Sequence, residues 1–536
     1  MQPALTTSSK SDWLDAIVAR ILYCWDLPLL QNKLIGLALA AFLAACCLVR
    51  AYIGMDGILA YSHDAFVFLE GAWRIFHGQH SNVDFYSDHG PFMYLETSFG
   101  IWLAHGSPAG FGYAQALVAS VLGLWALFLT SHRLSAVPRA LFCIAIVLLA
   151  VSPYTLGEPI VRTTSAMVYN RFGYCMVALA ILEAALQREP SSPLSELAGG
   201  VSTGFITAVF LFLKISYFLW MGPLVLLLIP CRPQTLRRWI GLACGFVAGF
   251  LPFLVYDHGT LLPMINDLRI VGAAKHIQWR WYVVEAGYYS IGPMVIFVML
   301  AGALLWKEGS YRTARQAALI GAATILSSSF LLLTNFQHNQ LPLDAVGAIL
   351  ILYLVNSRPR QSAYLWIRGI LTLWGALFIL IPISADCAGL VAGVKNKVKA
   401  AHEPRAHFHS ARLAGFSSLE LDYVRIVNDG IDLLEQYRQP GDTVMSMDFS
   451  NPFSFALGMP PARGGTTGLQ FNTNFSDAHH PAPEWLIGHA TLVMVPRVYT
   501  DGSLQESMPR IYGPYLNAHY QLVGQSREWK LYRRQT

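Results

Sequence analysis

Residues 56–91, DGILAYSHDAFVFLEGAWRIFHGQHSNVDFYSDHGP, are the stretch from which the fold of this chain can be worked out. They follow the first long apolar run and concentrate acids and histidines in a chain that is otherwise mostly apolar. The first part, Asp56–His77, carries apolar residues at helical spacing, so we expect an amphipathic helix lying on a membrane surface. The next apolar run, Phe92–Ala104, is short of the roughly 20 residues of a full span, so we expect a surface or re-entrant piece.

The composition of the whole chain predicts a polytopic α-helical membrane protein. Of its 536 residues 54% are hydrophobic and 13% charged, against about 25% charged in soluble domains. Apolar windows recur from Lys33 to Ser384 and predict eleven spans. They are approximately Leu34–Ile53, Tyr113–Leu129, Leu141–Tyr154, Gly173–Leu186, Val201–Leu213, Tyr217–Ile229, Ile240–Tyr256, Ile291–Leu305, Ala318–Leu333, Leu343–Leu354 and Gly369–Ile383. The sequence has no basic patch of the kind that binds nucleic acid. Its eight cysteines include no CxxC motif, so a zinc site is not indicated.

The distribution of basic loops predicts the orientation. The loops at 132–139, 232–238, 307–315 and 358–368 fall on one side, which the positive-inside rule assigns to the cytoplasm. We therefore expect a cytoplasmic segment 1–32, a transmembrane catalytic domain 33–384 with its first external loop at 54–110, and an extracytoplasmic region 385–536. The chain lacks eukaryotic retrieval signals, which favours a bacterial inner (plasma) membrane.

The region after Ala385 alternates like a small α/β domain. The patterns predict helices, strands and a closing hairpin in this order: helix Leu421–Tyr437, strand Thr443–Met447, strand Thr491–Val495, helix Leu504–His519, and hairpin strands Tyr520–Gly524 and Trp529–Tyr532. We expect this domain to shape access of an acceptor rather than to catalyse.

The most promising chemical group of the first loop is Asp64, beside His63. A carboxylate where membrane and water meet can remove the proton from an acceptor hydroxyl while that hydroxyl attacks the anomeric carbon of a sugar. It is equally suited to be a solvated acid or a helix cap. Asp84, Asp88 and His89 can assist by positioning an acceptor or, with Asp64, by binding a divalent metal such as Mg or Mn. The two aspartates also suit ordinary Asx turns.

These residues stand in an order that resembles a known family. A first helix, a loop aspartate, an amphipathic helix and then DFYSDHGPFMYL at 84–95 resemble the start of GT-C glycosyltransferases, in particular the lipid A aminoarabinose transferase and protein O-mannosyltransferase families. Asp64 matches the catalytic aspartate of these families, although Ala65 replaces the glutamate that often follows. His89-Gly90-Pro91-Phe92 replaces a basic residue before Pro-Pro-Leu, and Gln340-Leu341-Pro342-Leu343 resembles the Tyr-Leu-Leu-Pro-Leu segment.

The resemblance implies a polyprenyl-phosphate sugar as the donor. Departure of a lipid phosphate calls for fixed cations beside it, and the candidates are Arg162, Arg171 and Lys214. A lone lysine between two apolar helices favours a functional role, although it can also reach the interface by snorkelling. His338 and Gln340 are candidates for contacting the sugar or the phosphate, or for capping a helix.

The residues and the resemblance together predict an inverting membrane glycosyltransferase of the cell envelope. Its acceptor is expected to be a glycan (for example a polysaccharide), a lipid or a protein. One alternative is an O-antigen-type ligase or polymerase that uses lipid-diphosphate glycans. The other is a lipid or sugar transporter, but paired inverted halves and charges at mid-membrane do not stand out in the sequence.

Overall fold

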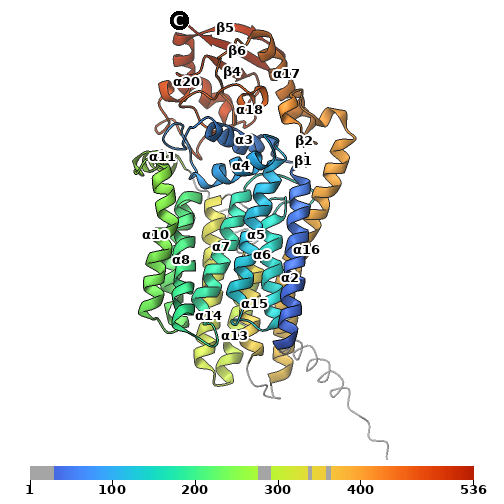
Figure 1. Ribbon diagram of the computed structural model, residues 1–536, viewed down its shortest axis with the longest axis vertical. Helices are drawn as coiled ribbons and strands as arrows, with labels where there is room; N and C mark the ends of the chain where they lie inside the picture. The colour runs from blue at the N-terminus through green and yellow to red at the C-terminus, as the bar shows by residue number, and fades with distance from the viewer. Residues whose placement is uncertain (1–28, 276–290, 336–340, 358–363, 536) are drawn as a thin grey trace, which may run out of the picture.

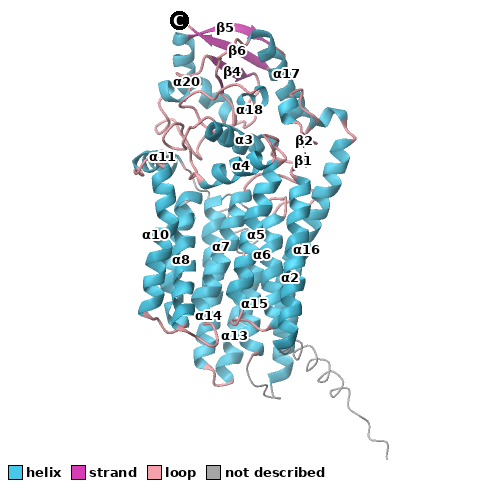
Figure 2. Cartoon of the chain, viewed as in Figure 1, coloured by secondary structure: helices cyan, strands magenta, loops and turns pink. Residues whose placement is uncertain are grey.

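The computed structural model describes residues 29–275, 291–335, 341–357 and 364–535. Its apolar runs form a bundle of upright helices, and among these residues strands lie only at the end that carries the C-terminal region (Figures 1 and 2). We call this end of the bundle the capped end.

Each of the eleven expected spans corresponds to a helix of the bundle. These helices are α2 (Leu29–Ile53), α5 (Gly110–Thr130), α6 (Ala136–Val151), α7 (Val168–Ala185), α8 (Pro193–Leu213), α9 (Ile215–Leu228), α10 (Leu236–Tyr256), α13 (Gly292–Lys307), α14 (Tyr311–Asn335), α15 (Asp344–Asn356) and α16 (Leu365–Ala401). Among the described residues, six of them (α2, α5, α8, α10, α14 and α16) are long and apolar enough to cross a membrane. The chain is thus a polytopic helical membrane protein, and the count of eleven crossings stays a prediction.

Glycines bring α8 and α10 into close contact along their length. A Cβ on Gly200 or Gly204 would lie 2.0 or 1.9 Å from a carbonyl oxygen of α10, and one on Gly241 or Gly245 would lie 2.2 or 2.1 Å from a carbonyl oxygen of α8. Both pairs are four residues apart, the small-residue spacing that lets helix backbones approach within membranes. The crossing fixes the position of α8, whose C-terminal end leads directly into Lys214.

The capped end is formed first by two helices that lie across the bundle, α3 (Ser62–Phe76) and α4 (Phe92–Leu103) (Figure 1). That α3 lies on a membrane surface, and that α4 is a surface or re-entrant piece, stays a prediction. The expected start of the first helix at Asp56 was wrong, because Met55–Ile58 forms strand β1, parallel to β2 (Phe416–Ser418). A Cβ on Gly57, whose φ is +69°, would lie 2.3 Å from the backbone of α16, so this close approach admits only glycine.

The C-terminal region has the helices and strands that its sequence predicts. Helices α17 (Leu421–Tyr437) and α20 (Leu504–His519) accompany two short ones, α18 (Phe453–Leu457) and α19 (Pro483–Leu486). The sheet has the order β3-β4-β6-β5, formed by Val444–Ser446, Leu492–Pro496, Trp529–Arg534 and Tyr520–Gln525. Strand β3 is parallel to β4, and the other neighbours are antiparallel. The expected boundary at Ala385 falls inside α16, which continues to Ala401, and the division into domains stays a prediction.

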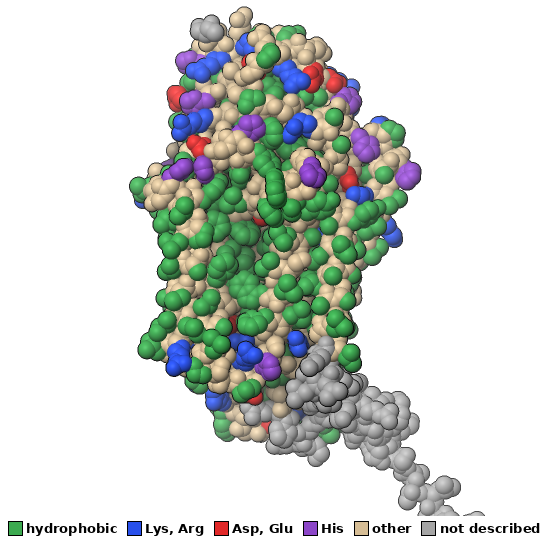
Figure 3. Space-filling view, viewed as in Figure 1, with side chains coloured by type: hydrophobic (Ala, Val, Ile, Leu, Met, Phe, Trp, Pro, Cys, Tyr) green, Lys and Arg blue, Asp and Glu red, His purple; other side chains and the backbone are tan. Residues whose placement is uncertain are grey.

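The opposite end of the bundle holds the basic loops, and several of their cations are paired. Glu183 of α7 lies 3.1 Å from Arg232 and 2.8 Å from Arg238. Lys and Arg side chains gather at this end and around the C-terminal region, with apolar side chains covering the surface between (Figure 3). This arrangement is typical of an integral membrane protein, while the side on which each end lies stays a prediction.

Candidate active site

Asp64 lies in the first turn of α3, and the C-terminal region caps that turn. The backbone N–H of Ser62 donates to Oε2 of Glu420 at 2.7 Å, and the hydroxyls of Ser62 and Ser418 lie 2.6 Å apart. A helix N-terminus needs acceptors for its first amides, and a nearby side chain of the same segment usually supplies them. Here the acceptor comes from a residue more than 350 positions away, so the fold of the C-terminal region fixes the position of Asp64.

The surroundings of Asp64 make it a stronger proton acceptor than an ordinary aspartate. Its side chain is 22% exposed, and Nε2 of His63 lies 3.7 Å from Oδ1. Burial raises the pKa of the Asp64 carboxyl, and the Glu420 carboxylate raises it further. His63 and His89 oppose this rise without cancelling it. A base with a raised pKa is better matched to removing a proton near neutral pH.

The loop before α4 brings Asp88 and His89 beside the same site. Nδ1 of His89 lies 2.6 Å from Oδ1 of Asp88, and Oδ2 of Asp88 accepts from Nδ2 of Asn474 at 3.2 Å. Burial alone would raise the pKa of Asp88, but His89, Asn474 and Lys214 together lower it below its usual range. Asp88 therefore stays ionised.

This loop packs directly on the C-terminal end of α8. A Cβ on Gly90 would lie 2.1 Å from the carbonyl oxygen of Phe212, so only glycine allows the approach. Phe212 is two residues before Lys214, and Lys214 is the one-residue turn between α8 and α9. The contact therefore holds the Asp88–His89 pair close to that lysine.

Tyr169 connects the two parts of the site. Its ring centroid is 4.6 Å from that of His89, and Nζ of Lys214 lies 5.3 Å from the same ring. The aspartate near His89 and the lysine at the helix turn thus face a common aromatic side chain. A cation held over an aromatic ring in a largely buried place is stabilised by the ring and kept in a defined position.

A second lysine adds positive charge at this point. Lys275 ends helix α11 (Leu262–Ala274), and its Nζ donates to the carbonyl oxygen of Thr334 at 2.6 Å. Burial and, to a smaller extent, Lys275 lower the pKa of Lys214 to about 7, with Asp88 acting against both. Burial likewise lowers the pKa of Lys275, against the effect of Asp88. Two partly buried lysines around one ionised aspartate favour the binding of an anion, because an added negative charge relieves their repulsion.

Helix α11 is tied to the loop that carries Asp88. Oδ2 of Asp267 accepts from Nδ2 of Asn82 at 2.8 Å and from the backbone N–H of Ser87 at 3.1 Å. These hydrogen bonds fix α11 against the loop, and they explain how Lys275 comes to lie near Asp88.

The structure does not bring Asp84 into this site. Its Oδ2 accepts from the backbone N–H of His80 at 2.8 Å, and its Oδ1 lies 3.4 Å from Nε of Arg463. In the described part of the chain, no group of three or more His, Cys, Asp or Glu side chains could hold a metal ion. The residues present therefore do not fit the metal site considered for Asp64, Asp84 and Asp88, and no step below is routed through a metal.

The two candidate arginines lie in different places. Arg162 is 43% exposed, lies 3.3 Å from Glu158 and stands over the ring of Tyr61, at the edge of the Asp64 environment. Arg171 is buried, lies 3.1 Å from Asp386 and donates to the carbonyl oxygen of Tyr154. Its guanidinium is occupied by the interior of the bundle, so the structure does not place Arg171 with Lys214.

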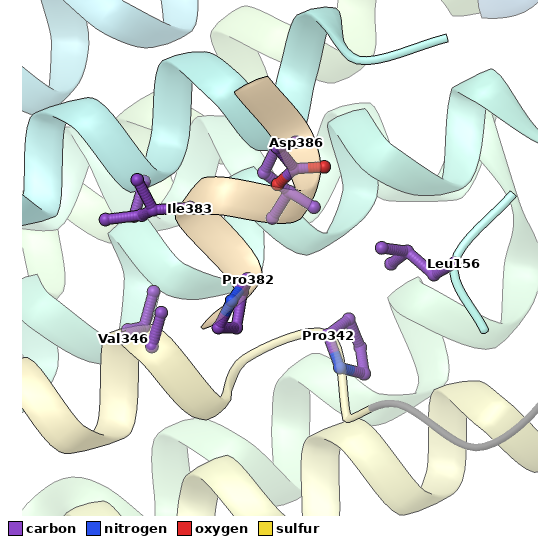
Figure 4. A pocket seen from close by; sticks show the side chains of 9 residues that line it. Leu156, Pro342, Val346, Pro382, Ile383 and Asp386 are labelled. Atoms are coloured by element: carbon purple, nitrogen blue, oxygen red, sulfur yellow. The ribbon is translucent and has the colours of Figure 1, made fainter. Parts of the chain in front are cut away.

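Asp386, the partner of Arg171, borders a separate hollow between α6, α15 and α16. Apolar side chains including Leu156, Val346 and Pro342 form most of its wall (Figure 4). Pro342 belongs to the Gln-Leu-Pro-Leu segment that the sequence singled out. Two candidate residues, Gln340 at the start of that segment and His338 just before it, lie outside the described residues.

Four residues of the site were not assigned to it from the sequence: Tyr169, Lys275, Glu420 and Asn474. The local sequence around each of them is explained by ordinary secondary structure, such as the start of a helix or a polar turn. Only the fold brings them to Asp64, Asp88 and Lys214, so no signal in their immediate sequence could have found them.

Comparison with known proteins gives structural neighbours alone. No family model matches the chain, and no curated protein matches it. Two of the structural neighbours are crystal structures of ArnT from Cupriavidus metallidurans, each aligned over 92% of this chain and 97% of that chain. The structure bound to undecaprenyl phosphate is 12% identical with a TM-score of 0.47, and the apo structure is 13% identical with a TM-score of 0.44. ArnT is a lipid A aminoarabinose transferase, a GT-C glycosyltransferase of the kind that the first-loop motifs resemble.

Proposed function

We propose that this protein is an inverting membrane glycosyltransferase that moves a sugar from a polyprenyl-phosphate donor to an acceptor at the capped end. The main support for the proposal is that a candidate base and a pair of cations suited to a phosphate lie in one site. A carboxylate with a raised pKa, Asp64, is linked through His89 and Tyr169 to the lysine pair Lys214 and Lys275.

The lysine pair is the part of the site that suits the donor. When the bond between the anomeric carbon and the phosphate oxygen breaks, negative charge grows on the leaving lipid phosphate. Fixed cations that already face this position stabilise the charge without reorganising. Lys214 stands at the capped end of two apolar helices, so a phosphate there is placed where its polyprenyl chain can lie against the bundle.

Asp64 is the part of the site that suits the acceptor. Its carboxylate takes the proton of the acceptor hydroxyl while the oxygen of that hydroxyl attacks the anomeric carbon. The new bond forms on the face opposite the departing phosphate, and the configuration inverts. Glu420 assists this step because its charge raises the proton affinity of Asp64, and because its hydrogen bond to Ser62 holds the first turn of α3 in place.

The acceptor is a glycan, a lipid or a protein that reaches the capped end of the bundle. We propose that this end faces the outside of a bacterial inner membrane, where lipid-linked sugars are consumed in building the cell envelope. The proposal follows the basic loops at the opposite end, which the positive-inside rule places in the cytoplasm.

The test uses the full-length protein in lipid nanodiscs and compares Asp64→Asn with Lys214→Met. Asp64→Asn should reduce transfer by about 10²–10⁴-fold, the usual contribution of a general base, with little change in donor binding. Lys214→Met should weaken use of the donor more than use of the acceptor. Undiminished transfer by Asp64→Asn would refute the role of the base.

A comparison of donors separates this function from its rivals. Polyprenyl-monophosphate sugars should serve as substrates and lipid-diphosphate glycans should not, since the reverse preference is that of a ligase or polymerase. Movement of the lipid across the membrane without formation of a new glycosidic bond would indicate a transporter.

A further inference from the structure

A groove separate from the site of Asp64 opens at the other end of α3, beside the turn between α4 and α5. It holds about 580 Å³ of empty space, its open mouth included. Its wall is mostly aromatic: Trp73, Phe76, Ile101, Trp102, His105, Gly106, Arg412 and Phe455. None of these residues contributes to the proposed transfer reaction.

The outer wall of the groove exposes several large apolar side chains close together. Trp102 is 62% exposed, and the neighbouring Phe99, Leu103 and Phe76 are 45%, 43% and 41% exposed. Phe99 stacks on Trp102 with the ring centroids 5.6 Å apart. Large exposed apolar side chains gathered in one place mark a docking surface, and tryptophan is enriched at the level of lipid headgroups.

Arg412 places a fixed cation in this aromatic wall. Its guanidinium carbon lies 4.4 Å from the ring centroid of Trp73 and 5.4 Å from that of Phe455, and its Nε donates to the carbonyl oxygen of Phe455 at 3.0 Å. Among the described residues no carboxylate forms an ion pair with it, and burial is what lowers its pKa. A guanidinium held near two aromatic rings, with only its Nε hydrogen bond to the Phe455 carbonyl recorded among the described residues, can offer its terminal nitrogens to a phosphate group.

Helix α5, which begins shortly after the groove residues His105 and Gly106, carries an apolar stripe. A Cβ on Gly100 of α4 would lie 2.2 Å from the carbonyl oxygen of Gly110, so α5 begins immediately against the helix that forms the wall. The exposed apolar side chains of α5 recur every three or four residues and lie on one face: Tyr113, Leu117, Val121, Leu124 and Phe128. From the first to the last they extend about 22 Å along the helix, more than the depth of one leaflet.

We propose that this groove binds an anionic phospholipid of the leaflet at the capped end. The phosphate lies on Arg412, the glycerol region lies against Trp102 and Trp73, and one acyl chain runs along the exposed stripe of α5. The bundle surface beneath α4 is covered by apolar side chains, as such a chain requires (Figure 3). The binding site is independent of the transfer reaction proposed above and stands whether or not that reaction is correct.

The test measures the lipid retained by the full-length protein. Wild type and Arg412→Gln are reconstituted in nanodiscs with equal amounts of phosphatidylglycerol and phosphatidylcholine, extracted in mild detergent and weighed intact by native mass spectrometry. Wild type should retain one phosphatidylglycerol per chain in preference to phosphatidylcholine. Arg412→Gln should lower the retention of phosphatidylglycerol at least tenfold and remove the preference.

Two further variants keep the result interpretable. Arg405→Gln removes a nearby arginine that is 74% exposed and paired with Glu403, and it should retain lipid like the wild type. Trp102→Ser should lose both lipids, since it removes the apolar wall rather than the cation. Equal retention by Arg412→Gln and wild type would overturn the proposal. So would masses showing that a second copy of the chain, rather than a lipid, occupies the groove.

Discussion

Replacing Lys275 by methionine should make donor use weaker but extend it to higher pH. In the wild type the pKa of Lys214 is lowered to about 7 by burial and by Lys275. The charged form of Lys214, the form that binds phosphate, is therefore lost as the pH rises through about 7. Removing Lys275 removes a like charge, so the pKa of Lys214 rises and its charged form survives to higher pH.

The size of the first effect follows from the loss of one cation beside the phosphate. A hydrogen bond to a charged group contributes about 1.5–3 kcal/mol, so kcat/KM for the donor should fall by about 10- to 150-fold at the pH where wild type is most active. Asp88 offers no compensation, because it is already paired with His89 at 2.6 Å. The pH profile of kcat/KM reports the pKa values of groups in the free protein. Its basic limb, the fall of kcat/KM at high pH, therefore shifts with the pKa of Lys214, and the shift can be measured despite the lower rate.

The assay measures kcat/KM for a polyprenyl-monophosphate sugar across neutral pH in nanodiscs, for wild type, Lys275→Met and Lys397→Met. Lys397 is a matched control, because it also lies at the capped end but pairs with Asp56 at 2.9 Å, away from Lys214. Its variant should leave the basic limb in place. A basic limb that stays at the same pH in Lys275→Met would refute the coupling of the two lysines.

Three further predictions use the same preparation. Asp88→Asn should move the basic limb to lower pH, because it removes the charge that raises the pKa of Lys214. This shift is opposite in direction to that of Lys275→Met, and a shift in the same direction would contradict the proposed interaction of Asp88 with Lys214. Glu420→Gln should move the acidic limb to lower pH, since the pKa of Asp64, the proposed base, falls when its neighbour loses its charge. Glu420→Ala should also lower thermal stability by about 1 kcal/mol through loss of the helix cap. Gly90→Ala should cost about 1–3 kcal/mol in stability by overpacking against α8, whereas Gly272→Ala, which has open space around it, should be tolerated; both are read from thermal unfolding.

The sequence predicted the helices well because their signals are local. A run of apolar residues has to be helical within a membrane, so each expected span has its helix. The alternating patterns of the C-terminal region likewise gave the bounds of Leu421–Tyr437 and Leu504–His519. One missed element was β1, since Met55–Ile58 becomes a strand only through pairing with Phe416–Ser418, and nothing near it in sequence indicates that partner.

The site was predictable only where one residue is exceptional in its own surroundings. Lys214 breaks an apolar hairpin, and Asp64 opens an amphipathic helix, so both could be chosen from the sequence. Asp84 carries the same type of side chain, but its local turn and Arg463 engage it instead. Arg171 looked like a loop cation, whereas its partner Asp386 comes from a helix more than 200 residues later. The chemistry of a side chain is a local property, and its availability depends on the fold.

The C-terminal region contacts the surroundings of Asp64 and the carboxylate of Asp88, so we propose a role for it beyond shaping access of an acceptor. Glu420 caps the turn of Asp64, while Asn474 donates to Asp88 at 3.2 Å. These two contacts act with opposite sign, because the charge of Glu420 raises the pKa of Asp64 whereas the amide of Asn474 helps to lower that of Asp88. One carboxylate is thereby made a better proton acceptor, and the other is kept ionised beside the lysines. A region that only shaped the entrance would have no reason to set the two carboxylates apart, so we infer that it takes part in preparing the base and the anion site together.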